Sequence, residues 1–170
     1  SKWTMKKVKE IAVCFSGGTP STRNNAYYNG NIPWITSGDL NIRYIEQVKA
    51  SITELGLRNS STKIVKSGTV VIAMYGATAG IAAISQISAA INQAVLAIEL
   101  ADCSPQYIHA LLEFKKDWII DTYTQGGQPN LSGEIIKNLE FYLPDHKEQA
   151  AIASVLSDMD AEILLLKTKL

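Results

Sequence analysis

A run of β-branched and apolar residues between two glycine-containing turns constrains the fold most strongly. Residues 69–75, Thr-Val-Val-Ile-Ala-Met-Tyr, have the length and composition of a strand. The turn Lys66-Ser67-Gly68 precedes this run, and the segment Gly76-Ala77-Thr78-Ala79-Gly80 ends it. Two further apolar runs follow, over residues 81–87 and 90–100. The middle of the chain is therefore expected to form a small sheet.

Helical patterns lie on both sides of these strands. Residues 8–15 fit a short amphipathic helix, or a helix followed by a strand, that ends at Gly17-Gly18. Ser104 and Pro105 have the residue types of an N-cap and a first-turn proline. The helix that they begin has an apolar face, which we expect to lie in the core: Tyr107, Ile108, Leu111, Leu112, Phe114 and Trp118. The sequence thus predicts an α+β fold, with a small mixed or antiparallel sheet and flanking helices.

A long helix is predicted at the C-terminus. Asp145 and Glu148, which follow the last predicted strand at 139–143, have the spacing of a capping box. Apolar residues on this helix alternate in steps of four and three, the period of a coiled-coil seam: Ile152, Leu156, Met159, Ile163, Leu166 and Leu170. We therefore expect a globular domain over 1–143 and a coiled-coil or spacer helix over 144–170. The alternative is that this helix packs back on its own domain.

The functional signal lies in polar loops. Residues 16–23, Ser-Gly-Gly-Thr-Pro-Ser-Thr-Arg, form a Gly-rich turn, and Pro20 excludes a regular helix through it. The turn runs on into an Asn/Tyr/Trp-rich stretch with no acidic residue before Asp39. It lacks the Lys-Ser/Thr ending of a P-loop and the GxGxxG pattern, so we do not expect nucleotide binding here. Residues 32–40 are interpreted mainly as framework, and the exposed part of the turn, 18–23, as the functional part.

Residues of the usual catalytic and metal-binding types are isolated. His109 and His146 do not adjoin a Cys or Ser in a recognisable nucleophile setting, and acidic residues are scattered singly. Cys14 and Cys103 stand alone, which predicts buried free thiols and neither a zinc site nor a disulfide framework. Residues 31–34, Asn-Ile-Pro-Trp, only faintly resemble the catalytic motif of amino-methyltransferases and are interpreted as structural. We expect no catalytic residue and no metal site in this chain.

Composition places the chain among ordinary globular proteins. Hydrophobic residues make up 46% and charged residues 19% of its 170 residues, enough for one domain with a core. Sixteen basic residues balance sixteen acidic ones, which argues against a protein that coats nucleic acid non-specifically. No apolar run reaches the roughly 18 residues that span a bilayer, and the N-terminus lacks the apolar region of a signal peptide. We therefore expect a cytoplasmic protein with no membrane partner.

The polar loops hold residue types that contact DNA in known complexes. Arginine binds guanine bidentately, and asparagine or glutamine pairs with adenine. Hydroxyl groups and glycine amides suit phosphate oxygens. From residue type and loop position, the predicted DNA-contacting residues are Gly18, Thr19, Ser21, Thr22, Arg23, Tyr75, Gly76, Thr78, Gln93, Gln125, Gln128 and Asn130.

Several motifs in order resemble the type I restriction-modification specificity subunit. The first are Trp3, Gly-Gly-Thr-Pro-Ser-Thr at 17–22, Ile-Pro-Trp-Ile-Thr-Ser-Gly-Asp-Leu at 32–40 and Ser-Gly-Thr-Val-Val-Ile-Ala-Met-Tyr-Gly-Ala-Thr-Ala-Gly at 67–80. The later ones look like the same family's target recognition domain and the start of its long helix: Ile-Asn-Gln-Ala at 91–94, Gly-Gly-Gln-Pro-Asn-Leu-Ser at 126–132, and Pro144 with Glu148-Gln149 and Ile152-Ala153. The resemblance covers essentially the whole chain.

The resemblance implies a target recognition domain that reads one half of a bipartite double-stranded DNA site, and a helix that acts as a ruler against a second such helix. A full specificity subunit has two recognition domains and two helices, whereas this chain has one of each, so it is expected to be a half-subunit or a fragment. A half-subunit needs to form a homodimer to read both halves. Such a dimer fits the heptad seam and implies a palindromic bipartite target.

The resemblance also implies where the chemistry takes place. Modification subunits of the family bind S-adenosylmethionine and methylate adenine, and restriction subunits use ATP with Mg²⁺, so no cofactor is expected in this chain. The expected partners are DNA, modification subunits and, through them, restriction subunits. An alternative function is a helix-mediated scaffold or anti-restriction mimic that binds modification subunits without reading DNA. A third, a stand-alone methyltransferase, needs a cofactor site that the sequence lacks.

One departure from the family pattern concerns the loop after Tyr75. Ala77 and Ala79 make the segment from Gly76 to Gly80 unusually small. We interpret this as a close backbone approach, either to DNA or to a neighbouring strand.

Overall fold

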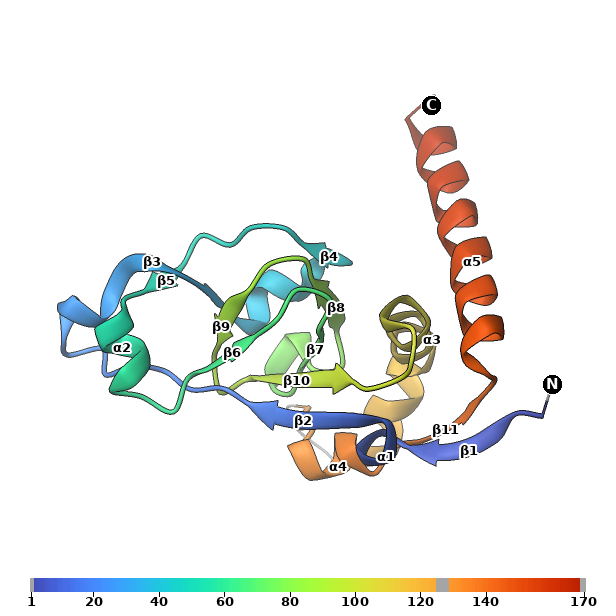
Figure 1. Cartoon of the computed structure of the whole chain (residues 1–170), viewed down its shortest axis with the longest axis horizontal. Helices are drawn as coiled ribbons and strands as arrows, with labels where there is room; N and C mark the ends of the chain where they lie inside the picture. Colours follow the sequence, from blue (N-terminus) through green and yellow to red (C-terminus); the bar gives the residue numbers. More distant parts are fainter. Residues whose placement is uncertain (1, 125–128, 169–170) are drawn as a thin grey trace.

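The computed structural model describes residues 2–124 and 129–168, which form a mixed α+β domain and a projecting C-terminal helix (Figure 1). The strands are β1 (Thr4–Lys7), β2 (Ala12–Ser16), β3 (Tyr28–Ile35), β4 (Tyr44–Ile45), β5 (Ser51–Ile52), β6 (Lys63–Val65), β7 (Val70–Ala73), β8 (Ala82–Ser85), β9 (Ala89–Ile91), β10 (Val95–Leu100) and β11 (Glu140–Leu143). The helices are α1 (Val8–Ile11), α2 (Glu54–Arg58), α3 (Pro105–Tyr123), α4 (Gly133–Lys137) and α5 (His146–Lys167), with 3-10 turns η1 (Asn25–Tyr27), η2 (Ser37–Asn41) and η3 (Gly76–Thr78). The predicted α+β class is confirmed.

The strands form two layers rather than the single central sheet expected. A five-stranded sheet has the order β2-β10-β7-β8-β4, and a four-stranded sheet has the order β5-β3-β9-β6, while β1 pairs with β11. The apolar run at 90–100 is divided between the layers, because Asn92 turns the chain between β9 and β10. Its side-chain Oδ1 accepts a hydrogen bond from the Ala94 amide at 3.0 Å, an arrangement that favours a turn.

The core lies on both faces of the five-stranded sheet. Side chains alternate between the faces of a strand, so Val70 and Ile72 of β7 pack toward α3, and Val71 and Ala73 pack toward the four-stranded sheet. Both groups are fully buried, as in a sheet covered on each side. The middle strands are therefore a rigid platform for the loops at their ends.

The α3 prediction is wrong for two of its three aromatic residues, Phe114 and Trp118, whereas Tyr107 is buried as expected. Ser104 caps α3 by accepting a hydrogen bond from the Tyr107 amide, and Ile108 and Leu112 are buried as expected. Phe114, however, is 81% exposed and Trp118 is 48% exposed. At 100° per residue, position 114 lies about 200° from position 112, on the opposite side of the helix from the sheet.

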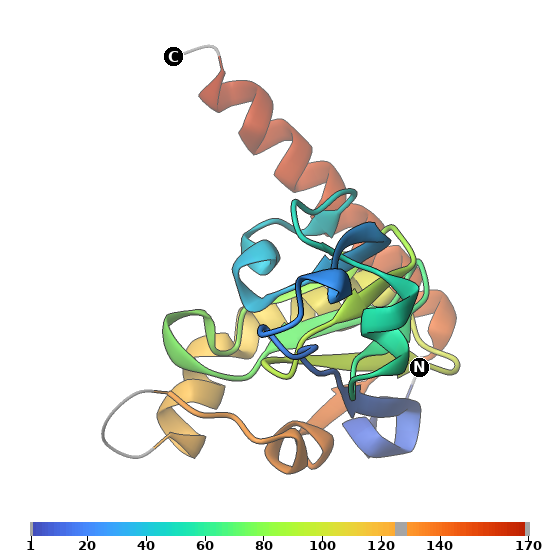
Figure 2. The same cartoon turned by 90° about the vertical axis from the view of Figure 1, so that its left-hand side faces the viewer.

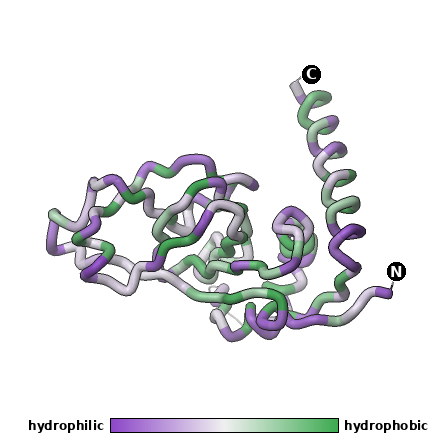
Figure 3. The backbone as a smooth tube through the Cα atoms, viewed as in Figure 1, coloured by the Kyte–Doolittle hydropathy of each residue, from purple (hydrophilic) through white to green (hydrophobic). Residues whose placement is uncertain are grey.

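Helix α5 projects away from the domain beyond its first turns (Figures 1 and 2). Asp145 caps it by accepting a hydrogen bond from the Glu148 amide at 2.9 Å, as the sequence predicts. Gln149 and Ala153 are buried at its base, whereas every described residue from Asp158 onward is exposed. Figure 3 shows hydrophobic residues recurring along the projecting part. The alternative that the whole helix packs back on its domain is therefore wrong.

Close backbone packing occurs at Gly17 and Gly18. A Cβ atom added to Gly17 would lie 1.8 Å from the carbonyl oxygen of Ile91, and one added to Gly18 would lie 2.1 Å from the hydroxyl oxygen of Ser61. Both glycines are buried, so the prediction that Gly18 is part of an exposed turn is wrong. The glycine pair allows the chain after β2 to pass close to the end of β9 and to the residues before β6.

We predict that Gly17→Ala lowers the free energy of unfolding by about 3 kcal/mol, because the new methyl group collides with backbone that cannot move freely. Urea denaturation measures the change. Gly38→Ala is the matched control, since the nearest atom to its added Cβ, the Thr36 hydroxyl oxygen, lies 3.9 Å away. Equal unfolding free energies for the two variants would contradict the prediction.

We predict that the stability of the fold depends on pH because of His109. It is 3% exposed on α3, and its Nε2 donates a hydrogen bond to the Ala82 carbonyl at 3.0 Å. Burial lowers the pKa of His109 below its ordinary value of 6.5, although Glu113 acts in the opposite direction. Below pH 6.5 the unfolded chain therefore takes up a proton that the folded chain resists, and stability falls as the pH drops.

We expect the free energy of unfolding of the wild type to decrease between about pH 7 and about pH 5.5, and His109→Gln to flatten this slope. Denaturant titrations at each pH measure it. His146→Gln, at an exposed position in the first turn of α5, should keep the wild-type slope. An unchanged slope in His109→Gln would show that other groups cause the dependence.

Candidate nucleic-acid interface

Strand pairing brings four loops to one edge of the five-stranded sheet. β2, β10, β7 and β8 are successive antiparallel neighbours, with Ser16 opposite Leu96, Val95 opposite Ala73, and Ile72 opposite Ala82. The chain therefore leaves β2 and β7, and enters β10 and β8, on the same side. We name residues 17–19, 74–80, 92–94 and 129–131 the loop edge, which faces the viewer in Figure 2.

The Gly-rich turn is bound to the loop before β10. The Gly17 amide donates a hydrogen bond to the Asn92 carbonyl at 3.2 Å, and the Gly18 amide donates to the Ile91 carbonyl at 3.1 Å. The Thr19 hydroxyl donates to the side-chain Oε1 of Gln93. Thr19 and Gln93, two predicted contact residues far apart in sequence, are thus direct neighbours.

The second Gly-containing loop is bound to the segment after α3. Tyr75 forms an antiparallel bridge with Asn130, and the Gly76 amide donates to the Pro129 carbonyl at 3.0 Å. Met74 joins this pair of loops to the first pair. Its amide donates to the Ala94 carbonyl at 2.8 Å, and its carbonyl accepts from the Leu131 amide at 2.7 Å. The loop edge is therefore one continuous hydrogen-bonded surface.

Seven predicted contact residues are exposed: Thr19, Ser21, Thr22, Arg23, Tyr75, Gln93 and Asn130. Gly76 and Thr78 are half-buried, and the Thr78 hydroxyl donates to the Tyr75 carbonyl at 3.4 Å. Gln125 and Gln128 lie outside the described residues. Ser21, Thr22 and Arg23 extend from the loop edge on a turn closed by a hydrogen bond from the Asn24 amide to the Ser21 carbonyl at 3.2 Å.

Within the domain, Gly76 is required by its backbone conformation rather than by close packing. Its φ is +69°, a conformation that side chains with a Cβ atom rarely adopt, and an added Cβ would meet no atom within 4 Å. The interpretation of a close backbone approach at Gly76 is wrong for contacts within the domain. At Gly80, with φ +80°, an added Cβ would lie 3.2 Å from Cγ of Lys116.

Residues behind the Gly-rich turn hold it in place. The Tyr28 hydroxyl donates to the Pro20 carbonyl at 2.5 Å, and the Tyr28 ring meets Trp34 edge-on, with centroids 6.0 Å apart. The buried Thr62 hydroxyl donates to the Gly18 carbonyl at 2.5 Å. These contacts agree with a framework role for the start of β3. Among the described residues, Trp34 Nε1 is the one buried side-chain nitrogen or oxygen without a hydrogen-bond partner.

Sequence reasoning missed Lys116. It lies on α3, and its contact with Gly80 places it beside the loop edge. No local pattern distinguishes it from the other lysines of the chain, because its position depends on how α3 packs over β8. Arg23 and Lys116 bring positive charge to this side of the domain, and none of the ion pairs among the described residues involves Arg23.

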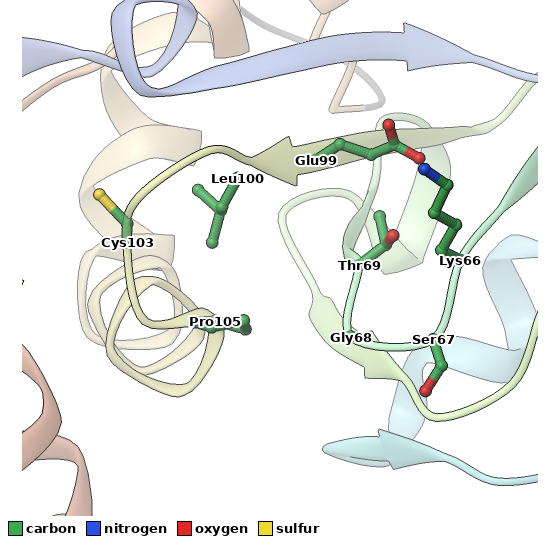
Figure 4. Close-up of a pocket in the computed structure, with 8 residues that line it drawn as sticks. All are labelled: Lys66, Ser67, Gly68, Thr69, Glu99, Leu100, Cys103 and Pro105. Atoms are coloured by element: carbon green, nitrogen blue, oxygen red, sulfur yellow. The ribbon is translucent and has the colours of Figure 1, made fainter.

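The opposite end of the sheet has a cavity of about 230 Å³ that contains none of the predicted contact residues (Figure 4). It is lined by Lys66, Ser67, Gly68, Thr69, Glu99, Leu100, Cys103 and Pro105. Figure 4 shows the Lys66 and Glu99 side chains pointing toward one another. Cys103 is half-buried, and burial raises the pKa of its thiol, which disfavours the reactive thiolate.

The remaining thiol is equally unsuited to nucleophilic chemistry. Cys14 is half-buried on β2, and burial raises its pKa to about 11, although Lys137 acts in the opposite direction. In the described part of the chain, no three His, Cys, Asp or Glu side chains are grouped to hold a metal ion. No helix there is long and apolar enough to cross a membrane. What the loop edge and the adjoining turn at 21–23 offer is hydroxyl, amide, phenol and guanidinium groups, which bind by hydrogen bonding.

The predicted seam of α5 is free in the single chain. Ile152 is half-buried at the base, whereas Leu156, Met159, Ile163 and Leu166 are exposed. Leu170 lies outside the described residues. These positions form a stripe along one side of the helix, and its described part is exposed beyond Ile152.

Comparison with known proteins gives consistent matches over the whole chain. The sequence model of the type I restriction modification DNA specificity domain matches residues 1–170. The type I restriction enzyme MjaIX specificity subunit of Methanocaldococcus jannaschii is 33% identical over 164 residues, 93% of this chain and 38% of that protein. The EcoR124I/EcoR124II specificity subunit of Escherichia coli is 25% identical over 162 residues, 91% of this chain and 40% of that protein.

Solved structures show the same fold. The HsdS subunit from Thermoanaerobacter tengcongensis aligns with a TM-score of 0.75 at 16% identity, over 98% of this chain and 39% of that one. The chain thus spans about two fifths of the length of the specificity subunits that it matches.

Proposed function

Since the chain belongs to the family of type I restriction-modification DNA specificity domains, we propose that it is a non-catalytic module that reads one half of a bipartite DNA target. Residues 1–143 are the target recognition domain in this proposal, and 144–170 are the spacer helix. The loop edge, with the adjoining turn at 21–23, is the proposed DNA-binding surface.

The observation that carries the proposal is the convergence of four sequence-distant loops on one edge. Thr19, Gln93, Tyr75 and Asn130 come from four segments and are exposed. Tyr75 and Asn130 form a backbone bridge, and Thr19 and Gln93 are joined by a side-chain hydrogen bond. Direct readout needs amide and hydroxyl groups held in a fixed arrangement, so that they match one pattern of base edges. The fully buried strands behind the loops provide that rigidity.

The charge of the chain indicates how the surface binds. Its formal net charge is zero, so non-specific attraction to phosphates is small. Arg23 and Lys116 are the cations that this proposal places near DNA. We therefore propose that stable binding also needs modification subunits, which dock on this chain, hold S-adenosylmethionine, and connect it to restriction subunits that use ATP with Mg²⁺.

Helix α5 is the proposed homodimer interface. An exposed apolar stripe at heptad spacing is stabilised when a second helix covers it. Leu156, Met159, Ile163 and Leu166 provide this stripe. A second copy of the chain would complete the bipartite reader and give its target two-fold symmetry. The same stripe is the observation that favours the alternative, a scaffold that binds modification subunits through the helix without reading DNA.

The DNA-reading proposal predicts that the chain, with its modification subunits, selects one sequence from a randomised duplex pool. We expect Arg23→Ala to weaken binding to the selected duplex by about tenfold, since a lost base or phosphate contact typically costs 1–3 kcal/mol. Electrophoretic mobility shifts at fixed salt measure this. Lys66→Ala removes one positive charge at the opposite end of the sheet and should leave affinity unchanged.

Selection that returns no sequence preference would overturn the DNA-reading proposal. If the chain still assembles with modification subunits in that case, the scaffold alternative is supported. Loop variants would then leave assembly unchanged.

The dimer proposal predicts that Ile163→Glu abolishes self-association, because two copies would bury a carboxylate in the seam. Sedimentation equilibrium measures the oligomeric state. Leu165→Glu is the matched control, since Leu165 is also exposed but lies outside the predicted heptad seam. A monomeric wild type, or equal loss of association in both variants, would contradict the seam as the interface.

A further inference from the structure

The base of α5 packs on the domain, where Gln149 and Ala153 are buried and Ile152 is half-buried. Gln149 is 3% exposed, and its Oε1 accepts a hydrogen bond from the Ser104 amide at 3.0 Å. Its Nε2 donates to the Pro144 carbonyl at 3.0 Å. These two bonds fix the base of α5 beside the N-terminus of α3. All of these contacts, however, lie near the start of the helix.

A second contact lies further along the helix. Nη1 of Arg43 lies 2.5 Å from Oδ2 of Asp160 on α5, and its Nη2 lies 3.3 Å from Oε2 of Glu113 on α3. The backbone of Arg43 is itself fixed, because its carbonyl accepts a hydrogen bond from the Ile84 amide of β8 at 2.7 Å. One arginine thus connects the five-stranded sheet, α3 and α5.

The position of this contact determines the direction of the helix. Asp160 follows Gln149 by eleven residues, or about 16 Å along the axis at 1.5 Å per residue. All described residues from Asp158 to Thr168 are exposed. Among them, only Asp160 forms an ion pair with the domain, and its partner is Arg43. The packing at the base and the contact at Asp160 together define the tilt of α5.

Arginine is suited to this position. Its planar guanidinium presents separate nitrogens to two carboxylates at once, whereas a lysine ammonium is a single point of charge. Burial of Arg43 disfavours its charge, but Asp160 and Glu113 outweigh that effect and raise its pKa. The contact is partly exposed, with 31% of the Arg43 and 49% of the Asp160 side chain accessible, so its energy is small. A small energy suffices to select one direction for a helix that has no other distal support in the described structure.

We infer that Arg43 is a positioning residue that sets the angle between α5 and the recognition domain, and thereby the spacing between the two half-sites that a dimer accepts. The angle follows from the contacts of the single chain. The link to spacing rests on the proposed function, because a helix that joins two recognition domains transmits its tilt to the distance between them.

The first experiment measures the angle without DNA. Spin labels at Gln86→Cys on the domain and Lys167→Cys near the helix end report one distance by electron paramagnetic resonance. Both added cysteines replace exposed residues, whereas Cys14 and Cys103 are half-buried with raised pKa values and react slowly. Dilution with excess unlabelled chain leaves only the distance within one chain.

We expect a narrow distance distribution in the wild type. In Arg43→Gln and in Asp160→Asn we expect a broadened distribution. The distance distribution of the double variant should be no broader than that of either single variant, because both substitutions remove the same contact. Asp158→Asn is the matched control on the same exposed segment of α5 and should keep the narrow distance. An unchanged distribution in Arg43→Gln overturns the inference.

The second experiment measures spacing. Duplexes carry the two selected half-sites with the spacer varied one base pair at a time, and binding is measured with modification subunits present. We expect Arg43→Gln to keep the selected bases but to lose about threefold in its preference for the best spacer over its neighbours. A broadened distance with an unchanged spacer preference overturns the link to spacing. A wild type without any sequence preference overturns the proposed function instead, while the distance measurement still tests the angle.

Discussion

The antiparallel pairing of β2, β10, β7 and β8 is the constraint on which the candidate surface depends. It places the end of β2, the start of β10, the end of β7 and the start of β8 on one edge. Gly17 makes this pairing possible beside β9, since any larger residue would collide with the Ile91 carbonyl. The loop edge is therefore a consequence of strand register, and its exposed side chains, such as those of Tyr75, Gln93 and Asn130, are free to differ without altering the platform.

Local signals in the sequence predicted most of the elements. Ser104 and Asp145 act as helix caps because capping depends only on residues within one turn, and the predicted helices follow them. The apolar runs likewise predicted strands, because the composition of a strand is also a local feature of the sequence. Their division into two layers could not be predicted, because the run at 90–100 is equally apolar on both sides of Asn92 and only the tertiary fold assigns β9 to the second sheet.

The same distinction separates the predictable from the unpredictable part of the site. Exposed polar loops were recognisable by composition, so Thr19, Tyr75, Gln93 and Asn130 were identified correctly as exposed loop residues. The burial of Gly18, the positive φ of Gly76 and the position of Lys116 beside Gly80 all depend on residues far away in sequence. Phe114 shows the limit for helices. An aromatic residue at approximate helical spacing suggests a core position, but a difference of two residues from Leu112 turns it to solvent.

Helix α3 connects the two functional parts of the molecule. Near its C-terminal end, Lys116 and Ile120 pack against Gly80 of the loop edge, and one turn earlier Glu113 binds Arg43, which also holds α5. Helix α3 is packed along the buried face of the five-stranded sheet. A displacement of the loop edge would therefore push against the same helix that contacts Arg43 and, through Arg43, α5. Under the proposed function, recognition of a half-site and the direction of the helix are thus both set by one packed body. In such a body, a substitution between α3 and the sheet is expected to change both.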